Sequence, residues 1–495
     1  MTLKPLITAS EVYPELERMI AGAEEEVLLS FRIFDPETAL RRPELREQGL
    51  ETWADLITEL VRRGVRVRIV LTDFDPLFAS PLHRAAWAAA SRLADDAEGD
   101  LQLLCAPHGQ EVGWLWRSML WMKIAEKLRL LRAEPPEKLT PVQRAMLKVR
   151  PRLRPVSIHQ KCAVVDGTTC MIGGLDVNER RWDDNAHDRP GEETWHDVSM
   201  AVDGPFAGIA RAHLIETWNA AFDGGAADLG TNARPMAAES RPQGTSDLRL
   251  VRTVSAPRSG PLAFGPRHHH REHEETLIRA FGAARDTIYI ETQFLRHAPL
   301  VQALNTAAQD RPDLNLIVLL PVEPERVLYD GDRSLNARHA HALQTRALTD
   351  LTDAFGDRIA LVTPAQRTAS EEPKRADLHG AASIYVHAKV TLIDDAFGLV
   401  GSANLNGRSL RWDTEASVLF RDQAVIDDLR RRLAGKWLGA AAETGDIRSA
   451  ALWRKTAQAN ADRAPAERSG FVLPYPLGRA QRFSRFLPIL PADMF

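Results

Sequence analysis

The segments HQKCAVVD (residues 159–166) and HAKVTLID (residues 387–394) share one pattern, His-x-Lys-x-x-x-x-Asp. They start 228 residues apart (387 − 159). Each is followed by a hydrophobic run and a glycine-led turn, MIGGLD in the first case and LVGSANLN in the second. The spacing from His159 to Asp176 equals the spacing from His387 to Asn404, 17 residues in each case. A repeat on the scale of half the chain predicts two similar domains.

Short β-rich runs flank both motifs in the same order. They pair as VLLSFRIF (27–34) with TIYIETQF (287–294), VRVRIVLT (65–72) with LNLIVLLP (314–321), and LQLLCAP (101–107) with IALVTP (359–364). Intervening patterns such as LITELVRR (56–63) predict helices. This alternation predicts an α/β fold in which each half is a mixed β-sheet flanked by helices, and the two halves are related by a pseudo-two-fold axis.

The predicted N-terminal domain covers residues 1–223, and the predicted C-terminal domain covers residues 248–447. Residues 224–247 are rich in small and polar residues with little periodicity, which predicts a linker. Residues 448–495 are expected to form a C-terminal tail with an apolar end. The first half carries about 29 extra residues before its motif, which predicts an insertion at about residues 110–155.

The residue types of the motif point to a phosphate site. In an extended strand, residues i and i+2 face the same side, so His159 would project with Lys161 and His387 with Lys389. Two such strands meeting at an interface would gather two imidazoles and two ammonium groups. Such a cluster is costly to bury without an anion, and a phosphate diester would supply the negative charge.

These motifs resemble the phospholipase D superfamily, over about residues 10–440. The resemblance is carried by both His-Lys motifs and by GSANLNGRS (401–409), IYIETQF (288–294) and GGLDVNERRWDD (173–184). WHDVSMAVDGPF (195–206) and RTVSAP (252–257) are most similar to the eukaryotic-type phospholipase D core, and cardiolipin synthases are related members. The resemblance implies two phospholipase-D-type domains with the active site at their interface.

The same resemblance implies a two-step displacement at phosphorus. One histidine attacks and forms a phosphohistidine, and the other protonates the leaving alcohol and then activates water or an acceptor alcohol. Similar enzymes usually use the N-terminal histidine as the nucleophile, which would be His159, with His387 as acid and base; the reverse assignment stays open. Lys161, Lys389 and Asn404 would bind the non-bridging oxygens.

A carboxylate behind each imidazole should fix its tautomer. Glu415, 28 residues after His387, is the candidate in one half, and Asp197, in TWHD, is the candidate in the other. Asp166 and Asp394 close the two motifs and are interpreted as structural residues that tie down loops next to the site.

The glycine-led turns differ at one position, because Asp176 stands where the second half has Asn404. A carboxylate facing a phosphate would repel it, so Asp176 is expected to bond to a lysine or to the backbone. The eukaryotic-type pattern also has Asp here, whereas nuclease and many cardiolipin synthase patterns have Asn, which favours the phospholipase-like branch. Ser402, in the second turn, is expected to donate a hydrogen bond to phosphate oxygen.

Composition narrows the class of protein. The 495-residue chain has a net charge of −4, which argues against binding dominated by nucleic acid. Three cysteines exclude a disulfide scaffold and fit a reducing compartment. With no run of 18 apolar residues and no signal-peptide core, the expected address is the cytoplasm, with peripheral membrane contact as an option.

The insertion has the composition of a membrane-binding segment. From Arg117 to Arg154 it carries eleven Lys or Arg and three Glu, a net charge of +8 that leaves −12 for the rest of the chain. Trp114, Trp116 and Trp121 stand at one end. Such a basic helix could lie in an anionic membrane interface through residues 113–154, or it could pack on its own domain, and both hypotheses stay open. Nucleic-acid binding is a third alternative, which the acidic balance of the whole chain disfavours.

RHHHREHEE (267–275) could bind a metal, but a solvated loop or a helix start is the favoured interpretation. The chemistry that the resemblance implies needs no metal, so no metal or other cofactor is expected. Both motifs lie in one chain, so a dimer is not required to complete the site.

The leading hypothesis is a phospholipase-D-type phosphodiesterase that hydrolyses glycerophospholipids to phosphatidic acid and a free head group. Head-group exchange is a closely related reaction, because the covalent intermediate can also accept an alcohol. The first alternative is a cardiolipin-synthase-like phosphatidyltransferase. The second is a nuclease, which would need a continuous basic groove. A non-catalytic phosphate-binding protein is the third, and it is disfavoured because both His-Lys pairs are intact.

Overall fold

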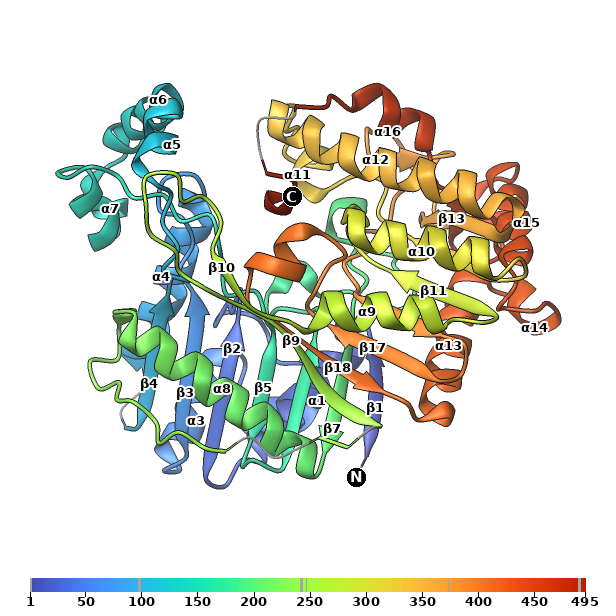
Figure 1. Cartoon of the computed structure of the whole chain (residues 1–495). Helices are drawn as coiled ribbons and strands as arrows, with labels where there is room; N and C mark the ends of the chain where they lie inside the picture. The colour runs from blue at the N-terminus through green and yellow to red at the C-terminus, as the bar shows by residue number, and fades with distance from the viewer. Residues whose placement is uncertain (1, 97–98, 241–243, 246, 373, 488–490) are drawn as a thin grey trace.

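Two large mixed β-sheets run through the molecule, one in each half of the chain (Figure 1). The computed structural model describes residues 2–96, 99–240, 244–245, 247–372, 374–487 and 491–495. Over these residues the first sheet has the strand order β1-β7-β6-β5-β2-β3-β4-β8, and the second has the order β10-β9-β18-β17-β16-β11-β12-β13-β19.

The strands of both sheets are short and mostly buried. The first sheet consists of β1 (Leu3–Ile7), β2 (Glu26–Phe31), β3 (Arg66–Thr72), β4 (Leu101–Ala106), β5 (Cys162–Val165), β6 (Thr169–Gly173), β7 (Val198–Asp203) and β8 (Ala227–Asp228). The second consists of β9 (Leu248–Ala256), β10 (Arg267–Arg271), β11 (Thr287–Glu291), β12 (Asn315–Leu319), β13 (Ile359–Pro364), β16 (Val390–Ile393), β17 (Phe397–Gly401), β18 (Glu415–Phe420) and β19 (Val472–Pro474).

The two sheets have one topology. Counted from β1 and from β9, the strands follow the same spatial order, and in each sheet three parallel strands, β2-β3-β4 or β11-β12-β13, join antiparallel neighbours. The paired β-rich runs of the sequence occupy equivalent strands. The prediction of two similar halves, each with a mixed sheet, is therefore confirmed.

The eighth strand of each repeat comes from a segment that we predicted to lie outside the two domains, the linker in one case and the C-terminal tail in the other. Strand β8 lies within the predicted linker and pairs with β4, and β19 lies within the predicted tail and pairs with β13. The tail also forms α15 (Ala450–Ala461), whose Trp453 packs 5.5 Å from the ring of Tyr289 on β11. Parts of both segments therefore complete the sheets.

Helices cover the outer faces of the sheets. The first half carries α1 (Ala9–Ala21), α3 (Trp53–Arg62), α4 (Ser80–Asp96) and α8 (Pro205–Asp223), and the second carries α9 (Glu272–Ala283), α10 (Ala298–Asp310), α12 (Leu335–Phe355), α13 (Gln423–Leu438) and α16 (Leu477–Phe483). Capping residues at the N-terminus stabilise the first turn of two of these helices. Thr52 and Asp55 form a capping box at α3, and the Asp422 side chain accepts from two backbone N–H groups at α13.

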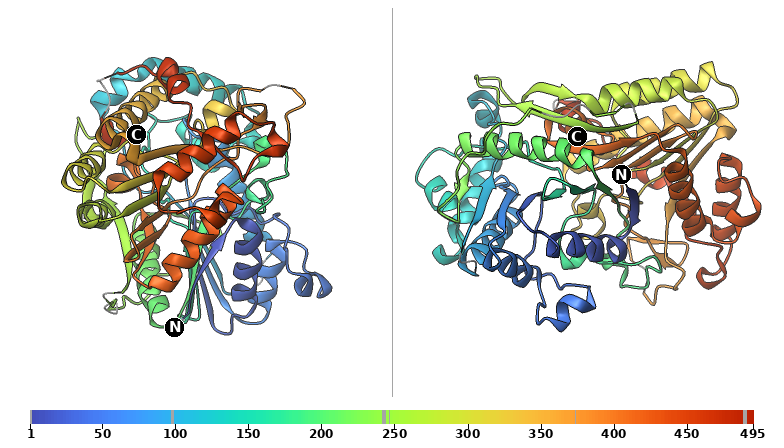
Figure 2. Two further views of the ribbon diagram at one scale, coloured as in Figure 1. Left: turned by 90° about the vertical axis from the view of Figure 1, so that its right-hand side faces the viewer. Right: turned by 90° about the horizontal axis from the view of Figure 1, so that it is seen from below.

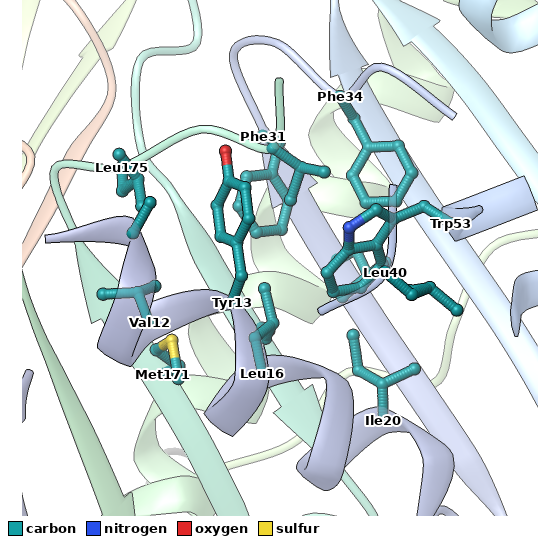
Figure 3. Close-up of a cluster of buried hydrophobic side chains, with 14 of the residues drawn as sticks. Val12, Tyr13, Leu16, Ile20, Phe31, Phe34, Leu40, Trp53, Met171 and Leu175 are labelled. Atoms are coloured by element: carbon teal, nitrogen blue, oxygen red, sulfur yellow. The ribbon is translucent and has the colours of Figure 1, made fainter. Parts of the chain in front are cut away.

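Close packing of aromatic and aliphatic side chains joins α1 to the first sheet. Tyr13 stands 6.5 Å from Trp53 between ring centroids, and Trp53 stands 5.7 Å from Phe34. The Tyr13 hydroxyl donates to the backbone carbonyl of Asp176 at 2.9 Å, so this core also anchors the glycine-led turn. Figure 3 shows the cluster, labelled at Val12, Tyr13, Leu16, Ile20, Phe31, Phe34, Leu40, Trp53, Met171 and Leu175.

The two halves share one buried apolar cluster. It contains Ile172 and Val198 from the first sheet together with Val390, Val400 and Val418 from the second. Seen from below in Figure 2, blue and cyan elements occupy one side of the molecule and orange and red elements the other. Because both motifs lead into β5 and β16 at this junction, the packing brings them to the domain interface.

Within the described residues, no helix has the length and apolar character that crossing a bilayer requires.

Asp166 and Asp394 act as backbone clamps at the far ends of β5 and β16 from the histidines. Both residues have positive φ angles, 49° and 48°. Each carboxylate accepts three consecutive backbone N–H groups at 2.8–2.9 Å, from Glu24, Glu25 and Glu26 in one half and from Arg285, Asp286 and Thr287 in the other. They therefore tie down the chain entering β2 and β11, rather than loops next to the site.

Substitution of either clamp should reduce stability. An Asn has one acceptor oxygen and turns an amide donor toward a backbone donor, so we expect Asp166→Asn and Asp394→Asn each to lower the free energy of unfolding by about 1–3 kcal/mol. Urea denaturation measures this change. Activity per folded molecule should persist at low temperature, and loss of activity in a variant that is fully folded would contradict the clamp role.

Candidate active site

Short bridges between the halves hold the two histidine segments. The His159 N–H donates to the carbonyl of Thr414 at 2.8 Å, and the His387 N–H donates to the carbonyl of His196 at 2.8 Å. Isolated parallel bridges join Ile158 to Thr414 and His196 to Val386. Each histidine is thus clamped by a segment of the opposite half.

The His-Lys pairs lie just before their strands, which begin at Cys162 and Val390, rather than within them as predicted. The expected alternation nevertheless holds. The side chain of Gln160 turns away from the site and donates to Ser30 Oγ at 3.0 Å and to Thr217 Oγ1 at 3.2 Å. The chain is therefore extended across the motif, and alternate residues face opposite sides.

The carboxylates behind the imidazoles cross between the halves. Nδ1 of His159 lies 3.0 Å from Glu415 of the second half, and Nδ1 of His387 lies 2.7 Å from Asp197 of the first. Both carboxylates are fully buried. A carboxylate that accepts from Nδ1–H orients the ring and leaves Nε2 for chemistry. The sequence identified both carboxylates but not this exchange.

The glycine-led turns shape these contacts differently in the two halves. A Cβ at Gly174 would lie 2.1 Å from Oδ1 of Asp197, so only glycine leaves room for that carboxylate. Ser402 occupies the equivalent place in the second half, and its hydroxyl donates to Glu415. The Ser402 hydroxyl thus supports the carboxylate behind His159, and its hydrogen bond to a phosphate oxygen stays a prediction.

The two lysines are buried beside their histidines. Lys161 Nζ donates to the carbonyl of His159 at 2.7 Å, and Lys389 Nζ donates to the carbonyl of His387. Lys161 also lies 3.9 Å from Oδ2 of Asp176, whose Oδ1 accepts from the backbone N–H of residue 33 at 2.9 Å. The prediction that Asp176 bonds to a lysine or the backbone is confirmed.

Asn404 is buried with part of its hydrogen-bonding capacity unused. Its Nδ2 lies 3.5 Å from Oε1 of Gln293, and its Oδ1 has no partner. Gln293 in turn donates to the hydroxyl of Tyr385 at 2.6 Å. Buried amides are normally satisfied, so this one is available to a ligand.

A buried polar network behind Asp197 carries no signal in the sequence. His196 bonds through Nε2 to Glu291 at 2.7 Å, and its Nδ1 lies 3.0 Å from Lys436 Nζ. Glu291 also accepts from Tyr289 and Trp437, at 2.6 Å each. Glu291 is thus enclosed by its neighbours and supports the segment that holds His387.

Arginines also approach the site. Arg181 lies over the ring of Trp195 at 4.2 Å, and Trp195 lies 4.8 Å from the ring of His387. Arg32 directly follows β2, and its buried Nε has no partner. Both lie in strings singled out in the sequence, but only the folded chain shows which side chains turn toward the histidines.

Burial sets the protonation of the site. It lowers the pKa of both His159 and His387 well below the usual range, and the neighbouring lysines lower it further. Burial also lowers the pKa of Lys389 to about 7, although Asp197 opposes the change. For the carboxylates, burial raises the pKa of Asp197 to about 7 and that of Glu415 to about 8. Burial thus disfavours charge in this site, and a bound anion would favour its cations.

The histidine-rich run lies outside this site. Residues 268–270 belong to β10, and His273 on α9 bonds to Thr253 at 3.0 Å and to Ser417 at 2.8 Å. The run is an edge strand and a helix start rather than a solvated loop. Among the residues that the structure describes, no three His, Cys, Asp or Glu side chains gather as a metal site.

Comparison with known proteins gives the family. Residues 16–188 and 277–437 match the family described as "Cardiolipin synthase, PLD-like domain". Cardiolipin synthase A of Pseudomonas fluorescens (strain SBW25) is 25% identical over 280 residues, which are 56% of this chain and 46% of that protein. Phospholipase D A of Dictyostelium discoideum is 24% identical over 341 residues, 57% of this chain and 25% of that protein. The matched region thus spans about half or less of these relatives.

A solved structure shares the fold. The crystal structure of phosphatidylserine synthase from Haemophilus influenzae Rd KW20 superposes with a TM-score of 0.54 at 12% identity and covers 87% of this chain and 85% of that one. At this identity the likeness concerns the fold alone.

The low pKa values predict a proton-linked anion site. Sulfate keeps its charge between pH 6 and 9, whereas Lys389, with a pKa of about 7, loses its proton over that range. We therefore expect sulfate affinity to fall as pH rises above 7, and sulfate binding at pH 8 to take up protons, because the anion raises the depressed pKa values.

Calorimetry in buffers of different ionisation enthalpy measures this uptake. Lys389→Met should weaken binding and remove most of the proton uptake. Affinity that is independent of pH, with no proton uptake, would contradict the assignment.

Proposed function

This chain belongs to the cardiolipin synthase family of PLD-like domains, and on that premise we propose that it transfers a phosphatidyl group from a phospholipid to an alcohol through a phosphohistidine. The observation that carries the proposal is the crossed pairing of each imidazole with a carboxylate of the other half, at 3.0 and 2.7 Å. His159 contributes to the lowered pKa of His387, so the two rings lie close enough for their charges to interact.

In the first step His159 acts as the nucleophile and His387 as the general acid. Nε2 of His159 attacks phosphorus, the bond from phosphorus to the leaving oxygen breaks, and Nε2–H of His387 gives its proton to that oxygen. In this proposal Lys161, Lys389 and the amide of Asn404 bind the non-bridging oxygens. The incoming negative charge favours the protonated lysines and the acid form of His387 that this step requires.

The second step reverses the first. Nε2 of His387 takes the proton of the acceptor alcohol, the alcohol oxygen attacks phosphorus, and the bond to Nε2 of His159 breaks. Asp197 and Glu415 keep both rings oriented throughout. Hydrolysis to phosphatidic acid, the leading expectation from sequence, has less support than transfer, since cardiolipin synthases of Pseudomonas fluorescens and Listeria monocytogenes are among the relatives. Water remains the competing acceptor.

The insertion supports action at an anionic lipid surface, as one of the two hypotheses from sequence supposes. Helices α5 (Trp114–Met119), α6 (Trp121–Ala133) and α7 (Pro141–Met146) stand apart from the sheets in Figure 1. Trp114 is 54% exposed, Trp121 51% and Met122 85%. Exposed basic side chains border them on α6: Lys123, Lys127, Arg129 and Arg132.

Other apolar side chains of the insertion pack inward. Ile124, Leu128 and Leu131 of α6 form a small cluster, and Trp116 packs 5.0 Å from Phe264. The insertion therefore has its own buried anchor, and the exposed tryptophans are not needed for it. Large apolar side chains beside cations are typical of surfaces that enter an anionic bilayer interface.

Product analysis tests the activity. Purified protein is incubated with phosphatidylglycerol vesicles and deuterium-labelled glycerol, or with a second primary alcohol, and lipids are identified by mass spectrometry. We expect phosphatidyl-alcohol products to exceed phosphatidic acid, and His159→Ala and His387→Ala each to lower the rate by about a thousandfold or more. Phosphatidic acid alone would support hydrolysis, and cleavage of single-stranded DNA without lipid turnover would support the nuclease alternative.

Vesicle binding tests the insertion. We expect Trp114→Ser with Trp121→Ser to weaken binding to anionic vesicles about tenfold, because both indoles leave the interface, and binding to weaken further as salt screens the basic residues. Ile278→Ser on α9, which removes another exposed apolar side chain, is the matched control. Equal vesicle binding by both variants, with unchanged melting temperatures, would contradict the membrane role.

A further inference from the structure

The string Arg-Trp-Asp occurs in both halves of the chain, shortly after each glycine-led turn. It occupies residues 181–183 in the first half and residues 411–413 in the second. The aspartate of each string accepts a backbone N–H from a segment of the site, that of Trp195 at 2.7 Å in the first half and that of Ser157 at 2.9 Å in the second. The two arginines are therefore equivalent members of the repeat.

The arginine of the second half has two carboxylate partners. Arg411 binds Glu274 through Nε at 3.0 Å and through Nη2 at 2.7 Å, and its Nη1 lies 3.2 Å from both oxygens of Asp493. Its string starts seven residues after Asn404 (411 − 404), two more than in the first half, and a π-helical turn (Arg408–Trp412) takes up the difference. The donors of Arg411 are thus used within the protein.

The arginine of the first half has no comparable partners. Arg181 is buried, with 7% of its surface exposed. Within the described part of the chain its ion pair is with Asp176, whose Oδ2 lies 4.0 Å from Nε, which is too far for a hydrogen bond. Its buried Nη1 has no hydrogen-bond partner among the described residues. A buried donor without an acceptor is costly, so a ligand oxygen that accepts from Nη1 would be favoured.

Two contacts place Arg181 between the two His-Lys pairs. On one side it shares Oδ2 of Asp176 with Lys161, whose Nζ lies 3.9 Å from that oxygen. On the other side its guanidinium lies 4.2 Å from the ring of Trp195, and that ring lies 4.8 Å from the ring of His387. Arg181 therefore links the lysine of one pair to the histidine of the other.

The charge of Arg181 acts on both pairs. Burial is the main cause that lowers the pKa of Lys161 and of His387, and the charge of Arg181 lowers both further. An anion bound among these three groups would offset their mutual repulsion.

The turn that carries Arg181 is held in place by the core of the first half. The hydroxyl of Tyr13 accepts from the backbone N–H of Asn178 at 3.0 Å and lies 2.9 Å from the carbonyl oxygens of Asp176 and Asn178. Tyr13 belongs to the packed cluster of Figure 3. The backbone N–H of Arg181 in turn donates to the carbonyl of Asn178 at 2.9 Å. Donors that are positioned before the reaction are the ones that stabilise developing charge.

We propose that Arg181 is a further catalytic residue, which donates a hydrogen bond from Nη1 to a non-bridging oxygen of the reacting phosphate. The inference rests on the proposed transfer through His159 and adds a residue to the group that binds the phosphate. Arg181 supplies in the first half the donor that Asn404 supplies in the second, because the carboxylate of Asp176 cannot donate. A guanidinium also keeps its charge in a site where burial disfavours charge on lysine and histidine.

Thio-substituted donor lipids test this contact. Phosphatidylglycerol in which sulfur replaces one non-bridging oxygen exists as two diastereomers at phosphorus, and sulfur is a weaker hydrogen-bond acceptor than oxygen. Transfer to a primary alcohol is measured with each diastereomer in detergent micelles. We expect Arg181→Gln to lower kcat/KM for the oxygen substrate by about a hundredfold and to change the ratio between the diastereomers by about tenfold. Arg181→Lys, which keeps the charge and loses the planar fork, should have smaller effects.

Arg41→Gln is the matched control. Arg41 lies 4.0 Å from the ring of Trp182 and pairs with Glu179, so this variant also loses a cation–π contact and an ion pair, and neither contact involves a His-Lys pair. It should leave the ratio between the diastereomers unchanged. The same ratio in Arg181→Gln as in the natural chain would overturn the proposal even if the rate falls, because a purely structural role slows both diastereomers alike.

Sulfate binding separates this inference from the proposed function. If the natural chain forms no phosphatidyl alcohol, transfer is refuted, and Arg181 is then judged by calorimetry with sulfate at about pH 6. Binding that is about tenfold weaker in Arg181→Gln than in Arg41→Gln supports the anion contact, and equal binding overturns it. If Arg181→Gln does not fold, Arg181→Lys is compared with Arg41→Lys in the same two assays.

Discussion

The crossed contacts between imidazoles and carboxylates are the constraint on which the rest of the structure depends. Glu415 of the second half orients His159 of the first, and Asp197 of the first orients His387 of the second. Neither half alone has an oriented imidazole. Three features hold the halves in the one arrangement that makes both contacts. They are the shared apolar cluster, the bridges at Thr414 and His196, and the segments that complete each sheet.

This arrangement places many ionisable groups out of water. Burial pushes the pKa of each histidine and of Lys389 down and the pKa of each carboxylate up, so burial alone disfavours the charges that the proposed chemistry needs. A phosphate diester reverses that balance because its charge stabilises the protonated forms. Affinity for anions is therefore a consequence of how the site is buried.

The duplicated halves have diverged where their tasks differ. Gly174 makes room for Asp197, whereas Ser402 at the equivalent place donates to Glu415. Asp176 is tied to the backbone and faces Lys161, whereas Asn404 keeps an unpartnered oxygen. The first half alone carries the insertion with its exposed tryptophans. A symmetric scaffold thus holds an asymmetric site, which suits a reaction in which one histidine attacks and the other exchanges protons.

The sequence by itself determined the duplicated α/β architecture and the main candidates of the site, because strand periodicity, equal spacing and a repeated motif are local properties of the chain. It named Glu415 and Asp197 but could not pair them, and it placed the eighth strands in a linker and a tail. It gave no sign that His196, Glu291 and Lys436 form one buried network. These features depend on contacts between residues distant in sequence, and only the docking of the two sheets decides which buried charges meet and which are left without a partner.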